Sequence, residues 1–265
     1  MQYDTEVVTI TLTANNGADM SGQVVTVNNE THTYSSPLSV KIPFGTNYSI
    51  SVNKNSEYVA PKAVKYTANQ KNRSVTLSYI YAPMGVYIYD TNGNFITANN
   101  WNTANNRNAV GVYVGTENSK FVIAPTYTEN GLSIWGDSVY ISGVVIDNNL
   151  NTAKKDYAGE ANTDNIIAKF GTDDDSAAKL CRNYTFKNGK KGYLWSLGEA
   201  QDAYNNKKAI DAAMGKIGGT VIKTIDFHWT STQKTGDSAW LLHWDSGVDY
   251  GGKYCSCFVR AVCSL

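Results

Sequence analysis

Two histidines and two cysteines in the C-terminal part of the sequence are the residues best suited to chemistry: His228, His243, Cys255 and Cys257. Imidazole nitrogens and thiolate sulfurs bind zinc, and four such ligands complete a tetrahedral site. On a strand, Cys255 and Cys257 would also point to the same face. Their spacing matches no paired Cys-x-x-C motif, so the sequence favours unrelated positions over a metal centre. We therefore expect neither a metal nor another cofactor.

The elements around these residues are expected to be strands. A strand over 239–244 would place its tryptophans on one face and Leu241, His243 and Asp245 on the other. We expect the tryptophan face in the core, rather than exposed as a sugar-stacking platform, and the other face in solvent. Further strands are expected over 221–229 and 258–262. Upstream, Thr163 is a candidate helix cap, and Ser196 to Glu199 has the capping-box pattern that starts a helix.

In the C-terminal sequence, a set of regularly placed residues, here called the frame, is interrupted by residues of unrelated chemistry. The frame consists of Trp229, Ser231, Thr232, Ala239, Trp240, Gly247, Lys253, Val259 and Arg260. It resembles the variable region of diversity-generating retroelement target proteins, a C-type-lectin-like family of phages and gut bacteria in which mutagenic reverse transcription rewrites surface codons. The segments "GVYIYD", "DYAGEANT" and "AAKLCRNYTFKNGKKGYLWSLGEA" resemble the same family and the related sulfatase-modifying-factor-like domains.

The resemblance also implies which residues vary. In that family, mutagenesis of AAC or AAT codons never produces Lys, Gln, Glu, Met or Trp. From His228 onward the chain has no Glu or Met, and three of its six Lys, Gln and Trp residues, Trp229, Trp240 and Lys253, belong to the frame. The resemblance therefore implies a variable region at about 226–258. Its implied ligand-binding residues are His228, Leu241, His243, Asp245, Asp249, Tyr250, Tyr254, Cys255, Ser256 and Cys257.

The N-terminal part of the chain has a different pattern. Residues from 5 to about 80 form short runs with period-two alternation, such as Val8, Ile10 and Leu12, separated by polar turns. This pattern predicts an all-β sandwich over 1–82 that serves as a spacer or attachment module. Its "IPFGTNYSISV" segment resembles immunoglobulin-like or PEGA-type repeats, which implies an immunoglobulin-like sandwich. After a boundary near Ala82-Pro83, an α+β C-type-lectin-like domain is expected over 83–265.

Composition limits the partners. The 23 basic residues are balanced by 23 acidic ones without a basic run, so nucleic acid is not an expected partner. No apolar run is long enough to span a membrane, and no signal-peptide pattern is present. The 18 tyrosines suit a binding surface, because tyrosine offers a large amphipathic contact area at low entropic cost.

The resemblance to retroelement target proteins implies a non-enzymatic, hypervariable receptor-binding protein or adhesin. It would act outside the cell, on a phage virion tail or a bacterial surface, and bind a protein or glycan on a target cell. A homotrimer would suit weak multivalent attachment. Two alternatives stay open. The same fold houses formylglycine-generating oxidases, which use a cysteine pair, and a pilus or tail subunit would use the fold for packing alone. Calcium-dependent sugar binding has no intact motif in this chain.

Overall fold

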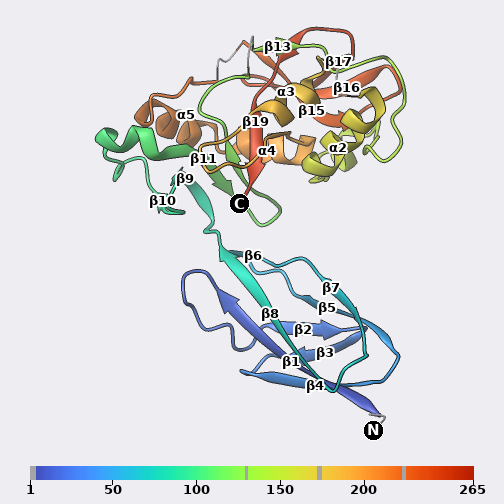
Figure 1. Cartoon of the computed structure of the whole chain (residues 1–265). Helices are drawn as coiled ribbons and strands as arrows, with labels where there is room; N and C mark the ends of the chain where they lie inside the picture. Colours follow the sequence, from blue (N-terminus) through green and yellow to red (C-terminus); the bar gives the residue numbers. More distant parts are fainter. Residues whose placement is uncertain (1–3, 129–130, 172–174, 223–224) are drawn as a thin grey trace. The chain divides into compact units, whose positions relative to one another are not determined.

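The computed structural model describes residues 4–128, 131–171, 175–222 and 225–265. The chain divides into two compact units, Met1–Pro83 and Met84–Leu265, one residue away from the expected boundary at Ala82-Pro83 (Figure 1). Strands account for 38% of the protein and helices for 19%, so the fold is β-rich.

The N-terminal unit is a β-sandwich. Its described residues form one sheet of β4 (Leu38–Pro43), β1 (Thr5–Ala14), β8 (Asn72–Tyr81) and β6 (Tyr58–Val59), and a second of β3 (Glu30–Thr33), β2 (Val24–Val27), β5 (Asn47–Val52) and β7 (Val64–Thr67). Both sheets contribute to one apolar core, in which Val8, Ile10 and Ile50 are fully buried. The period-two alternation predicted for these strands is confirmed by this burial.

Strand β1 occupies the centre of the first sheet. It pairs antiparallel with β4 and parallel with β8, and the parallel register runs from Val7 opposite Asn72 to Ala14 opposite Tyr79. The first and last long strands of the unit are therefore neighbours that point in the same direction.

A buried carboxylate joins the two sheets. Glu6 accepts hydrogen bonds from Tyr48 Oη at 2.7 Å and from Arg73 Nε at 2.6 Å. Burial alone would raise the pKa of Glu6, but the hydrogen bonds from Arg73, Tyr48 and two backbone N–H groups lower it to about 2. The carboxylate is thus held in its charged form.

The C-terminal unit contains two sheets and short helices. Its described residues form a sheet of β10 (Phe95–Ile96), β9 (Gly85–Asp90), β11 (Ala109–Gly115), β12 (Lys120–Ile123), β19 (Ala261–Ser264) and β14 (Tyr193–Leu194), and a second of β13 (Leu132–Ser133), β18 (Cys257–Phe258), β15 (Phe227–Gln233), β16 (Ser238–His243) and β17 (Gly247–Gly252). The helices are the 3-10 helix η1 (Thr103–Asn108), α1 (Leu150–Ala153), α2 (Gly159–Phe170), α3 (Ala177–Asn183), α4 (Leu197–Asn205) and α5 (Lys207–Lys216).

Two expected strands differ from the prediction. The strand expected over 221–229 begins only at Phe227, and residues 223–224 lie outside the described part of the chain. The single strand expected over 258–262 is two short strands, β18 and β19, which belong to different sheets. Between them lies Arg260, which is fully buried and donates from Nη1 to the carbonyl of Ala124 at 2.9 Å. The chain therefore passes from the five-stranded sheet to the six-stranded sheet at the buried guanidinium of Arg260.

The helices show one confirmed cap and one that is wrong. Ser196 and Glu199 form the predicted capping box at the start of α4. Thr163, in contrast, lies inside α2, where its Oγ1 donates to the carbonyl of Gly159 at 2.8 Å and accepts from the N–H of Leu194 at 3.0 Å. Its hydroxyl joins α2 to β14 instead of starting a helix.

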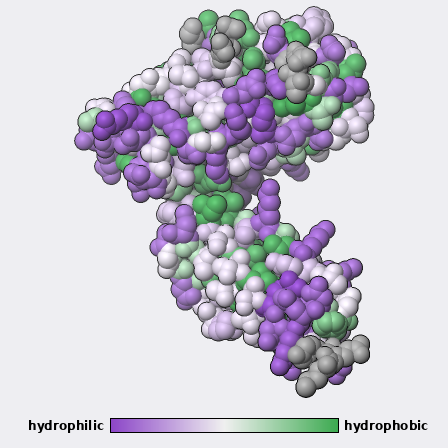
Figure 2. All heavy atoms as spheres, viewed as in Figure 1, coloured by the Kyte–Doolittle hydropathy of each residue, from purple (hydrophilic) through white to green (hydrophobic). Residues whose placement is uncertain are grey.

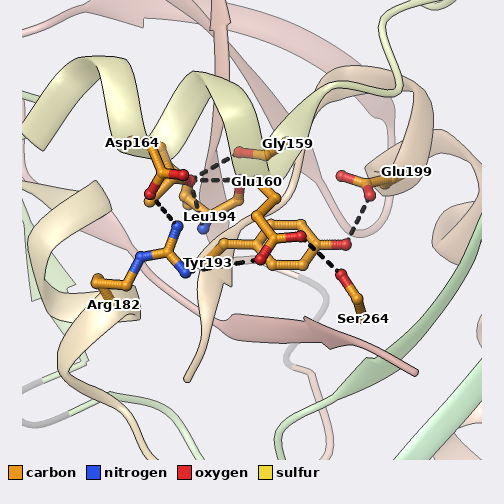
Figure 3. A network of polar contacts seen from close by, with 9 residues as sticks. Gly159, Glu160, Asp164, Arg182, Tyr193, Leu194, Glu199 and Ser264 are labelled. Atoms are coloured by element: carbon orange, nitrogen blue, oxygen red, sulfur yellow. Dashed lines mark hydrogen bonds and ion pairs between the residues drawn. The ribbon is translucent and has the colours of Figure 1, made fainter. Parts of the chain in front are cut away.

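A polar network surrounds this junction (Figure 3). Arg182 of α3 donates to Asp164 of α2, and Tyr193 Oη donates to Glu199 at 2.8 Å. Burial raises the pKa of Glu199 to about 7, against the lowering effect of its hydrogen bonds from Ser196 and Tyr193. The network holds α2, α3 and α4 against β14, the edge strand of the six-stranded sheet.

Candidate ligand-binding face

The predicted site residues lie mainly on the β16–β17 hairpin. In the described part of the chain, β17 pairs with β16 alone and forms one edge of the five-stranded sheet. The register places Asp249 opposite Leu241, Gly247 opposite His243 and Tyr250 opposite Trp240. Because directly opposed residues share a face of a sheet, this register decides which side chains lie together.

The three tryptophans of the C-terminal strands are in the core, as predicted. Trp229 and Trp244 are fully buried and Trp240 is 5% exposed. Trp229 Nε1 donates to the carbonyl of Ser133 at 3.0 Å, and Trp240 Nε1 donates to that of Asp147 at 2.8 Å. These hydrogen bonds satisfy the indole N–H groups of Trp229 and Trp240.

Three of the ten predicted site residues are not exposed, and that expectation was wrong for them. His228 is fully buried, Leu241 is 3% exposed and Cys257 is 9% exposed. The prediction assumed a sheet with one face in solvent. In the structure β15 is covered on both sides, since the segment that carries Ser133 and Trp135 bonds to its backbone and to Trp229. Alternation along a strand therefore did not separate buried from exposed side chains here.

His228 occupies an aromatic pocket instead of a surface. Its Nε2 lies 3.2 Å from Tyr127 Oη, and its ring lies 5.8 Å from the Phe258 ring and 6.4 Å from the Trp244 ring, centroid to centroid. Burial, followed by the positive charge of Arg260, lowers the pKa of His228 to about 3. The imidazole is therefore neutral across the physiological range.

The other seven predicted residues are accessible and follow the edge strand. His243 is half-buried, and the rest are exposed: Asp245, Asp249, Tyr250, Tyr254, Cys255 and Ser256. We call these seven residues the edge face. His243 is the last residue of β16, Asp245 lies in the turn before β17, and Tyr254 to Ser256 follow β17. The six residues of β17 span roughly 20 Å, so the edge face is a long strip along the sheet edge, with side chains on both faces of the sheet, and not a compact pocket.

The middle of the edge face presents two different side chains. Asp249 and Tyr250 are adjacent in a strand, so they point to opposite faces of the sheet. The Asp249 carboxylate accepts a hydrogen bond from the Tyr250 N–H at 2.8 Å. The Tyr250 ring lies 6.0 Å from the Trp240 ring, and the Lys234 ammonium lies 3.9 Å from its centroid. An aromatic side chain at this edge thus already holds a cation.

The first end of the edge face is built around His243. The Ser246 N–H donates to His243 Nδ1 at 3.0 Å, which makes Nδ1 the acceptor of the ring. The Phe227 ring lies 4.7 Å from the His243 ring and is 41% exposed. This end therefore combines an imidazole, an apolar ring and the exposed carboxylate of Asp245.

The second end is fixed by a buried lysine. Lys253 Nζ donates to the carbonyl of Val139 at 2.7 Å, to Gln233 Oε1 at 2.8 Å and to the carbonyl of Gly236 at 2.9 Å. Burial lowers the pKa of Lys253 to about 8. The next residue, Tyr254, is 72% exposed. One buried ammonium therefore ties the loop of Val139 to the end of β15 and to the β15–β16 turn, next in sequence to the most exposed tyrosine of this face.

The Tyr254 ring lies close to the backbone of Gly252. A Cβ atom at Gly252 would lie 2.7 Å from Cε1 of Tyr254. A larger residue at position 252 would therefore require this exposed ring to move aside.

The geometry offers little support for a zinc site or for cysteine chemistry at His228, His243, Cys255 and Cys257. Among the described residues, no three His, Cys, Asp or Glu side chains are placed to hold a metal ion. All four cysteines are free thiols. Burial raises the pKa of the Cys257 thiol to about 12, so the thiolate on which sulfur chemistry depends is disfavoured there.

Sequence reasoning left out two exposed aromatic residues beside the edge face. Phe227 contacts His243, and the pairing of β15 with β16 would have placed it there. Tyr140 is 57% exposed and lies next to Val139, whose carbonyl binds Lys253, in a loop without a periodic pattern. Figure 2 shows polar residues over most of the visible surface of the C-terminal unit, with small apolar groups between them.

Comparisons with known proteins define the fold more than the site. No family model matches the chain, and no curated protein matches it. The structure is similar to that of a fimbrial protein from Bacteroides ovatus, with a TM-score of 0.52 and 12% identity over 99% of this chain and 71% of that chain. The Bacillus anthracis TIE protein matches 36% of this chain and 24% of its own with 15% identity and a TM-score of 0.27, which supports no inference. In the described part of the chain, no helix is long and apolar enough to cross a membrane.

Proposed function

We propose that this chain is a surface-displayed binding protein whose C-terminal unit is a C-type-lectin-like scaffold and whose edge face binds a protein or glycan on a target cell. The observation that supports the proposal is that buried and exposed side chains lie next to each other along the C-terminal strands. The tryptophans of the frame are buried, whereas Asp245, Asp249, Tyr250 and Tyr254 are exposed. Residues can vary freely only where packing does not depend on them. This is the arrangement that a diversified surface needs.

The location outside the cell has a second, coarser support. The similarity to a fimbrial protein over nearly the whole chain fits a protein displayed at a cell surface. The same similarity favours an alternative, in which the chain is a fimbrial structural subunit and the edge face has no diversified ligand. The two proposals differ in the role of the edge face and agree on where the protein acts.

Two experiments test the proposal. The first is to sequence the DNA next to the coding region. A retroelement target requires a reverse transcriptase gene and a near-copy of the segment encoding about 226–258, rich in AAC or AAT codons. Absence of both removes the proposed origin of the variable residues.

The second experiment measures binding of the fluorescently labelled chain to a panel of intact bacterial cells. A variant with Asp245→Ala, Asp249→Ala, Tyr250→Ala and Tyr254→Ala should lose binding while its melting temperature stays close to that of the wild type. The structural-subunit alternative instead expects unchanged cell binding and concentration-dependent polymers in sedimentation.

A further inference from the structure

We propose that the ligand of the edge face is an extended basic segment of a protein, whose lysine or arginine side chains meet the carboxylates and tyrosines along β17. This inference rests on the proposed function and names the chemistry of its partner. It is carried by the length of the strip, by its charges and by the cation that the strip already holds.

The length of the edge face favours a macromolecule over a small sugar. Its accessible residues extend from Asp245 at one end of β17 to Tyr254 at the other, over roughly 20 Å for the strand. An extended segment of about six residues has the same length. A single sugar ring would cover only a fraction of the strip.

The charges available on the strip are negative. Residues 225–258 contain four aspartates and two lysines. Both lysines are engaged within the molecule, since the Lys253 ammonium is buried among carbonyl oxygens and the Lys234 ammonium lies over the Tyr250 ring. The carboxylates of Asp245 and Asp249, in contrast, face solvent. Charge complementarity therefore points to a cationic partner.

The strip also shows how it binds a cation. The Lys234 ammonium lies 3.9 Å from the centroid of Tyr250 and 5.6 Å from that of Trp240, within the range of cation–π attraction. The Lys234 side chain occupies the position over Tyr250 that we propose for a basic residue of the ligand. Tyr254, which is 72% exposed, offers a second ring of the same kind.

Side chains, and not the strand backbone, carry this recognition. An open sheet edge can bind an extended peptide through main-chain hydrogen bonds. Here the Asp249 carboxylate already accepts the Tyr250 N–H at 2.8 Å, so this backbone donor of β17 is engaged. A charge over an edge strand opposes strand addition. The partner is therefore recognised by its positive side chains.

The test uses three fluorescein-labelled peptides of equal length, in which serine alternates with lysine, with glutamate or with glutamine. Binding to the full chain is followed by fluorescence anisotropy at low and at physiological salt. We expect the lysine peptide to bind most tightly and to weaken as salt rises. An Asp245→Asn, Asp249→Asn double variant should bind it about three- to tenfold more weakly. The matched control, Asp4→Asn with Glu117→Gln, removes the same charge from exposed positions outside the strip and should bind like the wild type.

A second variant tests the direction of the change in affinity for the lysine peptide. Lys234→Gln removes the internal cation from Tyr250, so the lysine peptide should bind more tightly than to the wild type. Weaker binding of the lysine peptide to Lys234→Gln, or tighter binding of the glutamate peptide to the wild type, overturns the inference. So does tight binding of a neutral oligosaccharide on a glycan array without binding of the lysine peptide. If those results appear while the edge-face variant still loses binding to cells, the inference fails and the proposed function stands.

Discussion

At the scale of single residues, the four cysteines should differ sharply in reactivity. Cys255 is exposed, while Cys181, Cys257 and Cys263 are buried. Burial raises the pKa of each of these three thiols, to about 12 for Cys257 and Cys263. Iodoacetamide at neutral pH should therefore modify Cys255 alone in the folded protein and all four in denaturant, as read by mass spectrometry. Modification of Cys257 at the same rate as Cys255 would contradict the burial described here.

The tryptophan core makes a second prediction at this scale. Trp240→Ala should lower the free energy of unfolding by about 3–5 kcal/mol, because it removes a large buried side chain and leaves a cavity. A triple variant with His243→Ala, Tyr250→Ala and Tyr254→Ala should cost less, since these side chains are accessible. Urea titrations of both variants compare them directly. A larger loss in the triple variant would reject the assignment of frame and surface.

His228 should make stability depend on pH. Its pKa is lowered by burial from 6.5 to about 3, so the unfolded chain binds a proton more readily than the folded one between these values. The contribution of neutral His228 is complete above about pH 6.5 and is lost as the pH falls toward 3. The His228→Phe variant should show a smaller decrease in unfolding free energy from pH 7 to 5 than the wild type. An identical slope in both proteins would count against the buried neutral imidazole.

At the scale of elements, Lys253 should be the support of the second turn of the hairpin. Lys253→Met leaves the carbonyls of Val139 and Gly236 without their donor and removes one of the two donors to Gln233 Oε1. Each buried acceptor left unpaired costs ~1–3 kcal/mol. We expect a loss of several kcal/mol and faster hydrogen exchange at 253–256. The control Lys208→Met replaces an exposed lysine of α5 and should change neither.

The elements also show what the sequence can and cannot predict. The strands of the N-terminal sandwich and the capping box of α4 follow from local patterns, and the structure has both. The burial of His228 and Leu241 does not follow from such a pattern, because alternation describes the two faces of a strand and not what covers them. The covering segment around Ser133 and Trp135 has no periodicity. Thr163 was misplaced because a hydroxyl can cap a helix or bond within one.

At the scale of the whole molecule, the fold should depend neither on a metal nor on a disulfide. All four cysteines are free, and the C-terminal unit buries a large apolar core within one compact body. Chelator and reductant should each leave the melting temperature of the full chain almost unchanged in calorimetry. A large shift with chelator, or a stoichiometric zinc ion in the purified protein, would require a site that involves other geometry than the one described.

The parallel pairing of β1 with β8 has a mechanical consequence. The chain enters the N-terminal unit at the start of β1 and leaves it at the end of β8, and the register of the two strands extends from Val7 opposite Asn72 to Ala14 opposite Tyr79. Tension applied between these two points pulls the strands along each other, so that all hydrogen bonds of the ladder carry the load together and must break together. Resistance to pulling is set by the unfolding rate and not by equilibrium stability. The sandwich can therefore transmit force between whatever holds its first residue and whatever follows its last strand without opening one hydrogen bond at a time.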